Sequence, residues 1–589
     1  MKYIYILFLL VFITFSVKAQ KKKPPIKEKD TIKTEVINVV TSYTPKISDA
    51  TKINTKPKIV LSKKTAKNKL KYTIFSAPVA STFTPKSGIV KGINIGKKER
   101  LYNNYLAVGF GTNTTPFLEF FLHHNYKFNN EFGLFANYTS SENSIQSTLL
   151  DSNFSNLSVG LFFLQKERFF DWKISLKSER NKYNWYGLPN IPFSSTTLAK
   201  INEKQIYQHF KISGELIFED SLFKTANTSF SYFTDASKSK EFIFLLNTTI
   251  DIPLKNLGRR FNNLQTISKI ELITGSFIKE YTSKNSINYT IFTLGTNPFY
   301  KFEWKDFSIK VGTKLYFSAD TQLKTYDFFI YPDIKISYPI VNHLTFFIGS
   351  KGDLYTNSYR NIITKNPYVS PTLFITPTNE NYSFFGGLSG TISKNVGFNL
   401  KASYKNEEDK LLFIRNNSKS NGTNTSVAGI NLEGYEYGNS FSVFYDDVKT
   451  LSFSGYLEFD INKQFNIGLE AQYNKYTLKT QQYPWSLPNL KGAFIGKYKK
   501  NKIFVTTNIF YVGERKGITY NGTFPSTNGA PQILKSYVDV NLNGGYHFND
   551  KFSVFLNLKN IFGKKYQHFY NFDVQGFQAL AGATWKFDF

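Results

Sequence analysis

The chain has 589 residues, of which 17% are aromatic and 20% charged, and its overall hydropathy is below zero. It has no cysteine, which excludes disulfides, thiolate metal sites, cysteine nucleophiles and a lipoprotein anchor. No internal apolar run is long enough for a transmembrane helix, so a helical inner-membrane protein is not expected. Abundant Phe and Tyr in a polar chain are typical of half-buried strands with interfacial aromatic residues.

Residues 1–19 have the pattern of a secretory signal peptide. Lys2 precedes an apolar run from Ile4 to Val17, and the small residue Ala19 comes just before Gln20. A charged start, one short apolar core and a small residue at the cut predict export to the cell envelope.

The segment from Gln20 to Arg100 carries half of the net charge of +30, with 20 Lys and Arg against five Asp and Glu. Because an export signal precedes it and no folded binding motif accompanies it, we do not expect a nucleic-acid partner. Residues 20–42 are interpreted as a solvated, basic periplasmic tether. The alternative is an electrostatic partner such as anionic peptidoglycan or lipid phosphates.

Residues 43–100 contain several prolines and many lysines. They lack the hydrophobic periodicity of an independent domain. From residue 101 to residue 589, alternating strands and turns follow. One side of each strand is apolar, as in Phe132, Leu134, Ala136, Tyr138, Val396, Phe398, Leu400, Ala402, Tyr404, Phe453, Leu457, Leu469, Ala471 and Tyr473. The residues between them are largely polar, which predicts an all-β fold, a transmembrane antiparallel β-barrel with apolar residues outward and a wet lumen.

Short turns alternate with longer connections along the predicted barrel. The longer ones are expected near Asn184–Glu203, Lys351–Pro377, Asn406–Ser426 and Glu514–Leu534. This alternation is typical of periplasmic turns and extracellular loops. The available length gives about 20 to 24 strands, with 22 preferred and a porin of 16–18 strands as the alternative.

The C-terminal region contains the clearest strands. Tyr537–Asn549 and Phe552–Lys559 alternate apolar and polar residues around a tight turn, which predicts a hairpin. The last strand, Phe577–Phe589, has Trp585, Phe587 and Phe589 on its apolar face. A terminal strand that ends in Phe resembles the signal that the outer-membrane barrel assembly machinery reads.

The run Leu558–Tyr566, followed by a glycine-containing strand ending in Phe, resembles the C-terminal end of TonB-dependent outer-membrane receptors. The strand Asn489–Tyr498 and the segment Phe510–Arg515 are similar to the strand and loop that precede that end. The resemblance covers Phe453–Phe589. It implies a receptor-type barrel in the outer membrane of a Gram-negative bacterium, in contact with outer-membrane lipid.

The resemblance also implies a role for an extended segment near the N-terminus. Glu35, Val36, Ile37, Asn38, Val39, Val40 and Thr41 look like a TonB box, which pairs with a TonB-type energy transducer by strand addition. A full receptor then carries a folded plug, whereas residues 43–100 suffice only for a reduced plug or a lumen-threading segment. An ordinary strand is the alternative for residues 35–41.

We find no pattern for chemistry in the sequence. The six histidines form no metal motif, no catalytic set is recognisable, and no cofactor or enzymatic activity is expected. The aromatic residues Trp185, Tyr186 and Trp485 in predicted loops either contact a ligand at the extracellular mouth or pack the loops together.

The sequence therefore supports three functional hypotheses. The first is transport of a ligand across the outer membrane. The second is a non-transporting scaffold of an envelope complex with a periplasmic or outer-membrane companion protein, and the third is a passive porin. A barrel this wide needs an occluder, which is the segment 43–100, a set of folded-in loops or a second protein.

Overall fold

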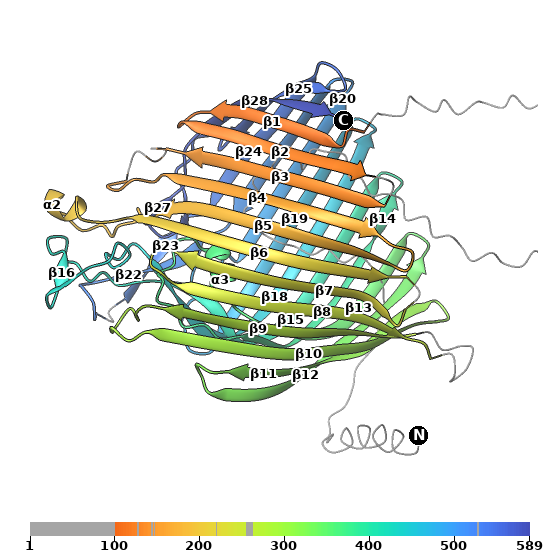
Figure 1. Cartoon of the computed structure of the whole chain (residues 1–589), viewed down its shortest axis with the longest axis horizontal. Coiled ribbons are helices and arrows are strands. Elements are labelled where there is room, and N and C mark those ends of the chain that lie inside the picture. Colours follow the sequence, from red (N-terminus) through yellow and green to blue (C-terminus); the bar gives the residue numbers. More distant parts are fainter. Residues whose placement is uncertain are drawn as a thin grey trace, which may run out of the picture.

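A single antiparallel sheet of 22 strands closes on itself to form a barrel (Figure 1). The computed structural model describes residues 101–588 except 127–128, 143–144, 146–147, 220, 255–262 and 527–528. The predicted fold class and the preferred strand number are confirmed. The predictions for residues 1–100 and for Phe589 lie outside the described residues.

The barrel strands are β1 (Asn104–Gly111), β2 (Thr115–Tyr126), β3 (Asn130–Ser141), β4 (Phe154–Lys166), β5 (Phe170–Asn184), β6 (Lys204–Phe218), β7 (Phe223–Asp235), β8 (Lys240–Ile252), β9 (Leu264–Phe277), β10 (Ile287–Trp304), β11 (Phe307–Asp320), β12 (Thr325–Val341), β13 (Leu344–Tyr355), β14 (Thr378–Ser393), β15 (Val396–Arg415), β18 (Phe441–Asn462), β19 (Phe465–Leu478), β20 (Leu490–Lys500), β21 (Ile503–Val512), β24 (Tyr537–His547), β25 (Phe552–Lys559) and β28 (Gln578–Phe587). Each pairs with its neighbour in chain order, and β28 pairs with β1. Closure leaves the sheet without an unpaired edge, as a barrel in lipid requires.

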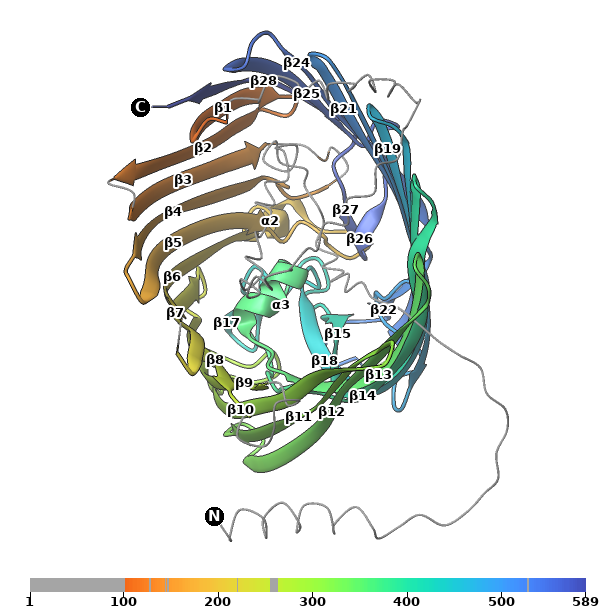
Figure 2. The same ribbon diagram turned by 90° about the vertical axis from the view of Figure 1, so that its right-hand side faces the viewer.

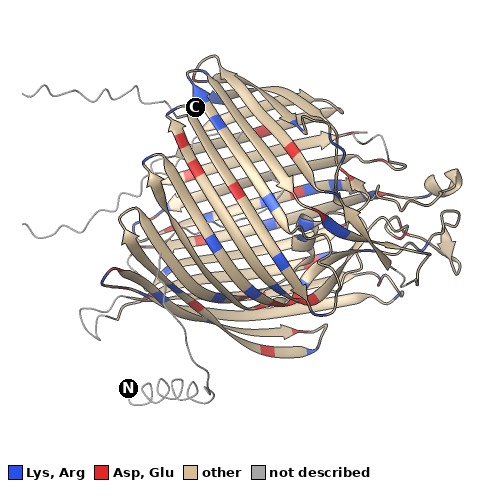
Figure 3. Ribbon diagram, turned by 180° about the vertical axis from the view of Figure 1, so that it is seen from behind, with Lys and Arg blue, Asp and Glu red and all other residues tan. Residues whose placement is uncertain are grey.

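The two faces of the barrel wall differ as the alternation predicts. Large apolar side chains such as Phe230, Leu400 and Phe453 are exposed on the outer face. Polar side chains such as Glu119 and Asn508 are buried on the inner face. Charged residues of both signs are scattered along the strands (Figure 3).

Phe555 interrupts the alternation of the hairpin because it points inward rather than toward lipid. Its side chain is buried beside Ala107, and a Cβ on Gly582 would lie 2.3 Å from its ring. The ring therefore needs glycine at this position of β28, next to the closing seam. A glycine in a strand allows this kind of close approach.

The longest connections lie at one end of the barrel, on the left in Figure 1. They include 185–203, 356–377, 416–440, 513–536 and 560–577. The start of β1 and the end of β28 lie at the opposite end, where the turns are short. The predicted alternation is confirmed, with two corrections: β13 extends to Tyr355 and β15 to Arg415, so the loops there begin later than expected. These strands continue because their partners extend with them.

The long connections contain short elements of their own. These are the helices α2 (Ser195–Leu198) and α3 (Tyr359–Lys365) and the hairpins β16 (Ser426–Val427) with β17 (Ile430–Asn431), β22 (Arg515–Tyr520) with β23 (Gly529–Leu534), and β26 (Gln567–Phe569) with β27 (Phe572–Asp573). In the part of the chain that the structure describes, neither helix has the length and apolar character to cross a membrane.

Candidate functional site

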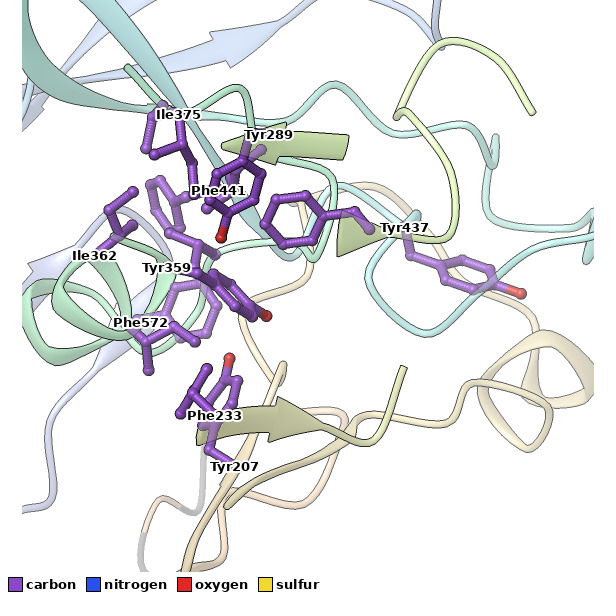
Figure 4. Close-up of a cluster of buried hydrophobic side chains, with 14 of the residues drawn as sticks. Tyr207, Phe233, Tyr289, Tyr359, Ile362, Ile375, Tyr437, Phe441 and Phe572 are labelled. Carbon is purple, nitrogen blue, oxygen red and sulfur yellow. The ribbon is translucent and has the colours of Figure 1, made fainter. Parts of the chain in front are cut away.

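The long connections fold into the mouth of the barrel instead of standing away from it. Helix α3 lies inside the ring of strands (Figure 2). Residues 185–203, 356–377, 416–440 and 560–577, which we call the loop assembly, contribute to one hydrophobic cluster with the inner wall. Its members include Tyr207, Phe233, Tyr289, Tyr359, Ile362, Ile375, Tyr437, Phe441 and Phe572 (Figure 4). Burial of so much apolar surface holds the loops in the mouth.

Helix α3 begins against a buried carboxylate of the wall. Glu241 on β8 is 1% exposed and accepts hydrogen bonds from the backbone N–H groups of Tyr359 (2.6 Å) and Arg360 (3.0 Å). The N-cap Ser358 accepts another from Asn361 N–H (3.1 Å). The first N–H groups of a helix have no partner within it and favour a negative charge. Glu241 therefore fixes the start of α3 on the barrel wall.

The side chain of Tyr359 fills a pocket of aromatic rings on the wall. Its ring lies 5.3 Å from that of Phe233 and 4.9 Å from that of Phe277, and the residue is fully buried. Its hydroxyl donates a hydrogen bond to Asp235 Oδ2 (2.7 Å). Burial raises the pKa of the Tyr359 hydroxyl well above its usual range. The group therefore stays neutral and serves as a donor.

An ion pair makes the third polar contact between α3 and the wall. Arg360 Nη2 lies 2.7 Å from Glu179 Oε2 on β5. The same carboxylate contacts His209 Nδ1 (2.9 Å) and Lys177 Nζ (2.6 Å). Glu179, Asp235 and Glu241, which we call the anchoring carboxylates, thus hold α3 from three strands, β5, β7 and β8.

The loops are also joined to one another. The rings of Tyr368 and Phe572 stack with centroids 3.9 Å apart, and Tyr186 packs edge-on against Phe572 at 5.0 Å. The Tyr186 hydroxyl donates to the backbone oxygen of Asp573 (2.8 Å). A Cβ on Gly187 would lie 2.4 Å from the Phe572 ring, so this close approach depends on glycine.

Arg415, at the end of β15, links two of the loops. It is 3% exposed, and it donates from Nε to the Gly438 oxygen (2.7 Å) and from Nη2 to the Gly187 oxygen (3.1 Å). These bonds satisfy carbonyl groups that burial would otherwise leave unpaired. A packed, hydrogen-bonded assembly of loops therefore lies in the mouth of the barrel.

Solved structures with the same architecture exist. FpvA of Pseudomonas aeruginosa, bound to heterologous pyoverdines, has a TM-score of 0.60 at 11% identity, covering 82% of this chain and 72% of that chain. The ferric-catecholate import receptor Fiu from E. coli K12 has a TM-score of 0.58 at 11% identity, covering 83% and 82%. The siderophore receptor PirA from Acinetobacter baumannii has 0.59 at 12%, covering 83% and 81%. No family model and no curated protein matches the sequence.

The chain has the barrel fold of the TonB-dependent receptors. It is accordingly an outer-membrane barrel, and the exposed apolar face meets lipid. The start of β1 and the end of β28 lie at the short-turn end of the barrel, and the loop assembly lies at the opposite end.

The aromatic residues predicted for the mouth of the barrel are buried. Trp185 is 3% exposed and packs edge-on against Tyr435 at 5.4 Å. Tyr186 lies in the loop assembly, and Trp485 donates from Nε1 to Gln481 Oε1 (2.7 Å). The structure places all three in contacts between or within loops, and ligand contact stays a prediction for them.

Of the proposed C-terminal assembly signal, Trp585 and Phe587 lie within the described residues. Trp585 is half exposed on the outer face, and its ring stacks on that of Phe587 at 4.7 Å. Phe589 and the segment Glu35–Thr41 lie outside the described residues. The role of these residues in assembly or TonB coupling stays a prediction.

Sequence reasoning missed the anchoring carboxylates and Tyr359. Glu241 occupies a polar position of an ordinary alternating strand, and no local signal separates it from other inward acids. The motif Ser358-Tyr359-Arg360, with Ser as a helix N-cap, was the one available sign of α3. Within the described residues, no group of three or more His, Cys, Asp or Glu could hold a metal ion.

Proposed function

We propose that this barrel transports a ligand across the outer membrane and that the loop assembly is its gate. The observation that carries the proposal is that α3 is attached to the barrel wall by a few polar contacts. Its polar contacts to the wall are hydrogen bonds and an ion pair with the anchoring carboxylates. Each such contact contributes only about 0.5–3 kcal/mol net, so a ligand that competes for them can release the helix. The similar barrels named for ferric-catecholate import and for siderophores support this proposal.

We further propose that Glu35–Thr41 couples the barrel to a TonB-type energy transducer. Because the chain has no cysteine, a single Asn38→Cys substitution gives a clean probe. We expect a disulfide cross-link from this position to a cysteine-substituted transducer in intact cells, and a much weaker one from Asn54→Cys. Equal cross-linking from both positions, or none from residue 38 of a folded barrel, would contradict the coupling.

Uptake measurements test transport itself. The first ligands to try are iron as ferripyoverdine and as ferric enterobactin, because receptors for these are among the similar structures. Cells that produce the chain should take up one of them, and deletion of residues 35–41 should abolish uptake while the barrel remains folded. Deletion of residues 21–27 serves as a control of equal length. Equal uptake by cells with and without the chain would contradict import of these ligands.

A non-transporting scaffold of an envelope complex is the second candidate. The mutual packing of the loops favours it, because Tyr368, Phe572 and Tyr186 form a closed apolar contact that needs no ligand. On this proposal, affinity purification from detergent-solubilised outer membranes should recover a stoichiometric companion protein. Recovery of the barrel alone would count against it.

The packed mouth disfavours a passive porin. Ion flow through the lumen would need a water path past the buried cluster of Tyr359 and Phe441. In planar bilayers without added ligand, we expect the protein to stay closed for most of the recording. A steady open conductance would instead favour the porin.

A further inference from the structure

The sequence contains four Asn-Gly pairs, and the structure places them in different surroundings. They are Asn421-Gly422, Asn521-Gly522, Asn528-Gly529 and Asn543-Gly544. Asn528 lies outside the described residues, which leaves three pairs to compare. An Asn-Gly pair can react within itself, because glycine has no Cβ and lets the backbone bend back toward the asparagine side chain.

The reaction is an attack of the glycine backbone nitrogen, after loss of its proton, on the side-chain Cγ of the asparagine. A bond forms between this nitrogen and Cγ, the Cγ–Nδ2 bond breaks, and ammonia leaves. Water then opens the resulting five-membered succinimide ring. Hydrolysis at Cγ gives aspartate, and hydrolysis at the main-chain carbonyl gives isoaspartate, whose main chain runs through Cγ. The reaction therefore needs a glycine N–H that is free of hydrogen bonds and an asparagine side chain that is free to move.

Asn543-Gly544 meets neither requirement. The pair lies within β24, between β21 on one side and β25 on the other. Asn543 is 4% exposed, and its Nδ2 donates a hydrogen bond to Asn557 Oδ1. The two neighbouring strands hold the backbone extended, so the pair cannot bend into a five-membered ring.

Asn421-Gly422 is held by a local turn. Asn421 Oδ1 accepts hydrogen bonds from the Thr423 N–H (3.0 Å) and from the Thr423 hydroxyl (2.8 Å). The Gly422 N–H donates to Ser420 Oγ (3.1 Å), and Gly422 is buried. An asparagine that hydrogen-bonds to the backbone two residues on stabilises its own turn. Both groups that would react are therefore engaged.

Asn521-Gly522 has neither restraint. The pair follows Tyr520, the last residue of β22, at the tip of the β22–β23 hairpin, and both residues are exposed. Within the part of the chain that the structure describes, the Asn521 side chain and the Gly522 N–H have no hydrogen-bond partner. A Cβ on Gly522 would meet only the Ser526 side chain, at 3.8 Å. The turn therefore leaves room for the ring to form.

The hydroxyl of Ser526 favours the loss of the Gly522 proton. It donates a hydrogen bond to the backbone oxygen of Asn521 (3.1 Å). This oxygen belongs to the same peptide group as the Gly522 nitrogen, and resonance joins the two atoms. When the nitrogen loses its proton, part of the negative charge falls on the oxygen, and a hydrogen-bond donor at that oxygen stabilises it.

We propose that Asn521-Gly522 is a site of spontaneous deamidation and that the Ser526 hydroxyl promotes the reaction. The product adds one negative charge to the tip of the hairpin, and isoaspartate also lengthens the main chain of the turn. The reaction is independent of the proposed transport, because it needs only water and the geometry of this hairpin.

Peptide mapping by mass spectrometry of the full-length protein in detergent tests the proposal. After incubation at mildly alkaline pH, deamidation at Asn521 should be at least about tenfold faster than at Asn421 or Asn543, because hydrogen bonds must break first at those two pairs. Fragment ions assign the change to residue 521 rather than to Asn528 in the same peptide. In guanidinium the three rates should converge. Equal rates in the folded protein, or a difference that persists undiminished in guanidinium, would overturn the proposal.

The variant Ser526→Ala tests the promoting hydroxyl. Deamidation at Asn521 should slow about two- to tenfold, since the variant removes one hydrogen bond. Thr523→Ala, in the same exposed turn, is the matched control and should leave the rate unchanged. Heat-modifiable gel mobility shows that the barrel of each variant is folded. A rate in the folded Ser526→Ala chain equal to or above that of the wild type would overturn the role of Ser526.

Discussion

Glu241 accepts a hydrogen bond from the backbone N–H of Tyr359 at 2.6 Å, across 118 positions of the sequence. This bond joins a strand of the barrel wall to the first turn of the helix that occupies the mouth. The start of α3 is therefore fixed to the wall by a side chain that looks ordinary in the sequence.

Substitution of Glu241 by Gln should loosen α3. Glutamine keeps the shape but removes the charge, and its single oxygen cannot replace the carboxylate that accepts from Tyr359, Arg360 and the Tyr289 hydroxyl. We expect a loss of about 1.5–3 kcal/mol in the protection of α3 amides, measured by hydrogen exchange. The exposed Glu303 provides the control variant Glu303→Gln. Unchanged exchange in α3 would show that the helix does not depend on this anchor.

Substitution of Gly187 by Ala should separate two loops. The new Cβ would lie 2.4 Å from the Phe572 ring, so the ring or the 185–203 loop must shift, at a cost of about 1–3 kcal/mol. Iodide quenching of the fluorescence of the neighbouring Trp185 should increase. Gly576→Ala, where a Cβ would meet nothing within 4 Å, should leave the quenching as it is. Equal quenching in both variants would contradict the contact.

The loop assembly should lose stability above about pH 10. Burial raises the pKa of Tyr186 and Tyr359 well above the usual range, and raises the pKa of Tyr368 to about 12. Above about pH 10, the buried tyrosine hydroxyls of the folded loops stay protonated, whereas those of released loops ionise. Stability is therefore complete below the ordinary tyrosine pKa and falls as pH rises through the folded values. Tyrosinate absorbance and Trp185 quenching should rise together, and constant quenching up to pH 12 would contradict this assignment.

A charge on the lipid face should destabilise the barrel more than one in the lumen. Phe230, in the middle of β7, is exposed on the outer face, and its neighbour Ser229 points inward. Phe230→Lys should cost about 2–4 kcal/mol in the free energy of unfolding from lipid, and Ser229→Lys much less. Urea titration in liposomes measures both. Equal costs would mean that the faces are assigned incorrectly.

The C-terminal aromatic residues should promote assembly. Phe587→Ala combined with removal of Phe589 should reduce the amount of heat-modifiable barrel in the outer membrane. Trp585 and Phe587 lie on the outer face, whereas Thr584 is buried on the inner face, so Thr584→Ala serves as the control. An unchanged yield of the double variant would remove the proposed signal.

The barrel itself could be predicted because the pattern that specifies each strand lies within that strand's own sequence. The alternation around Leu400 and Phe453 places apolar residues on one face whatever the partners of the strand, and lipid then selects that face for the outside. The ends of β13 and β15 were misjudged. In β15, the polar residues 406–410 interrupt the apolar alternation and resemble the start of a loop, although the strand continues to Arg415.

The closure of the mouth depended on the tertiary structure. The bond from Tyr186 to Asp573 spans 387 positions, and the contact of Arg360 with Glu179 spans 181. No periodic pattern in the sequence indicates these long-range contacts. They depend on the diameter of the barrel and on how the loops pack inside it. The sequence by itself thus predicted a membrane barrel of about 22 strands with the longer loops at one end. Only the packing of distant side chains decided that these loops fill it.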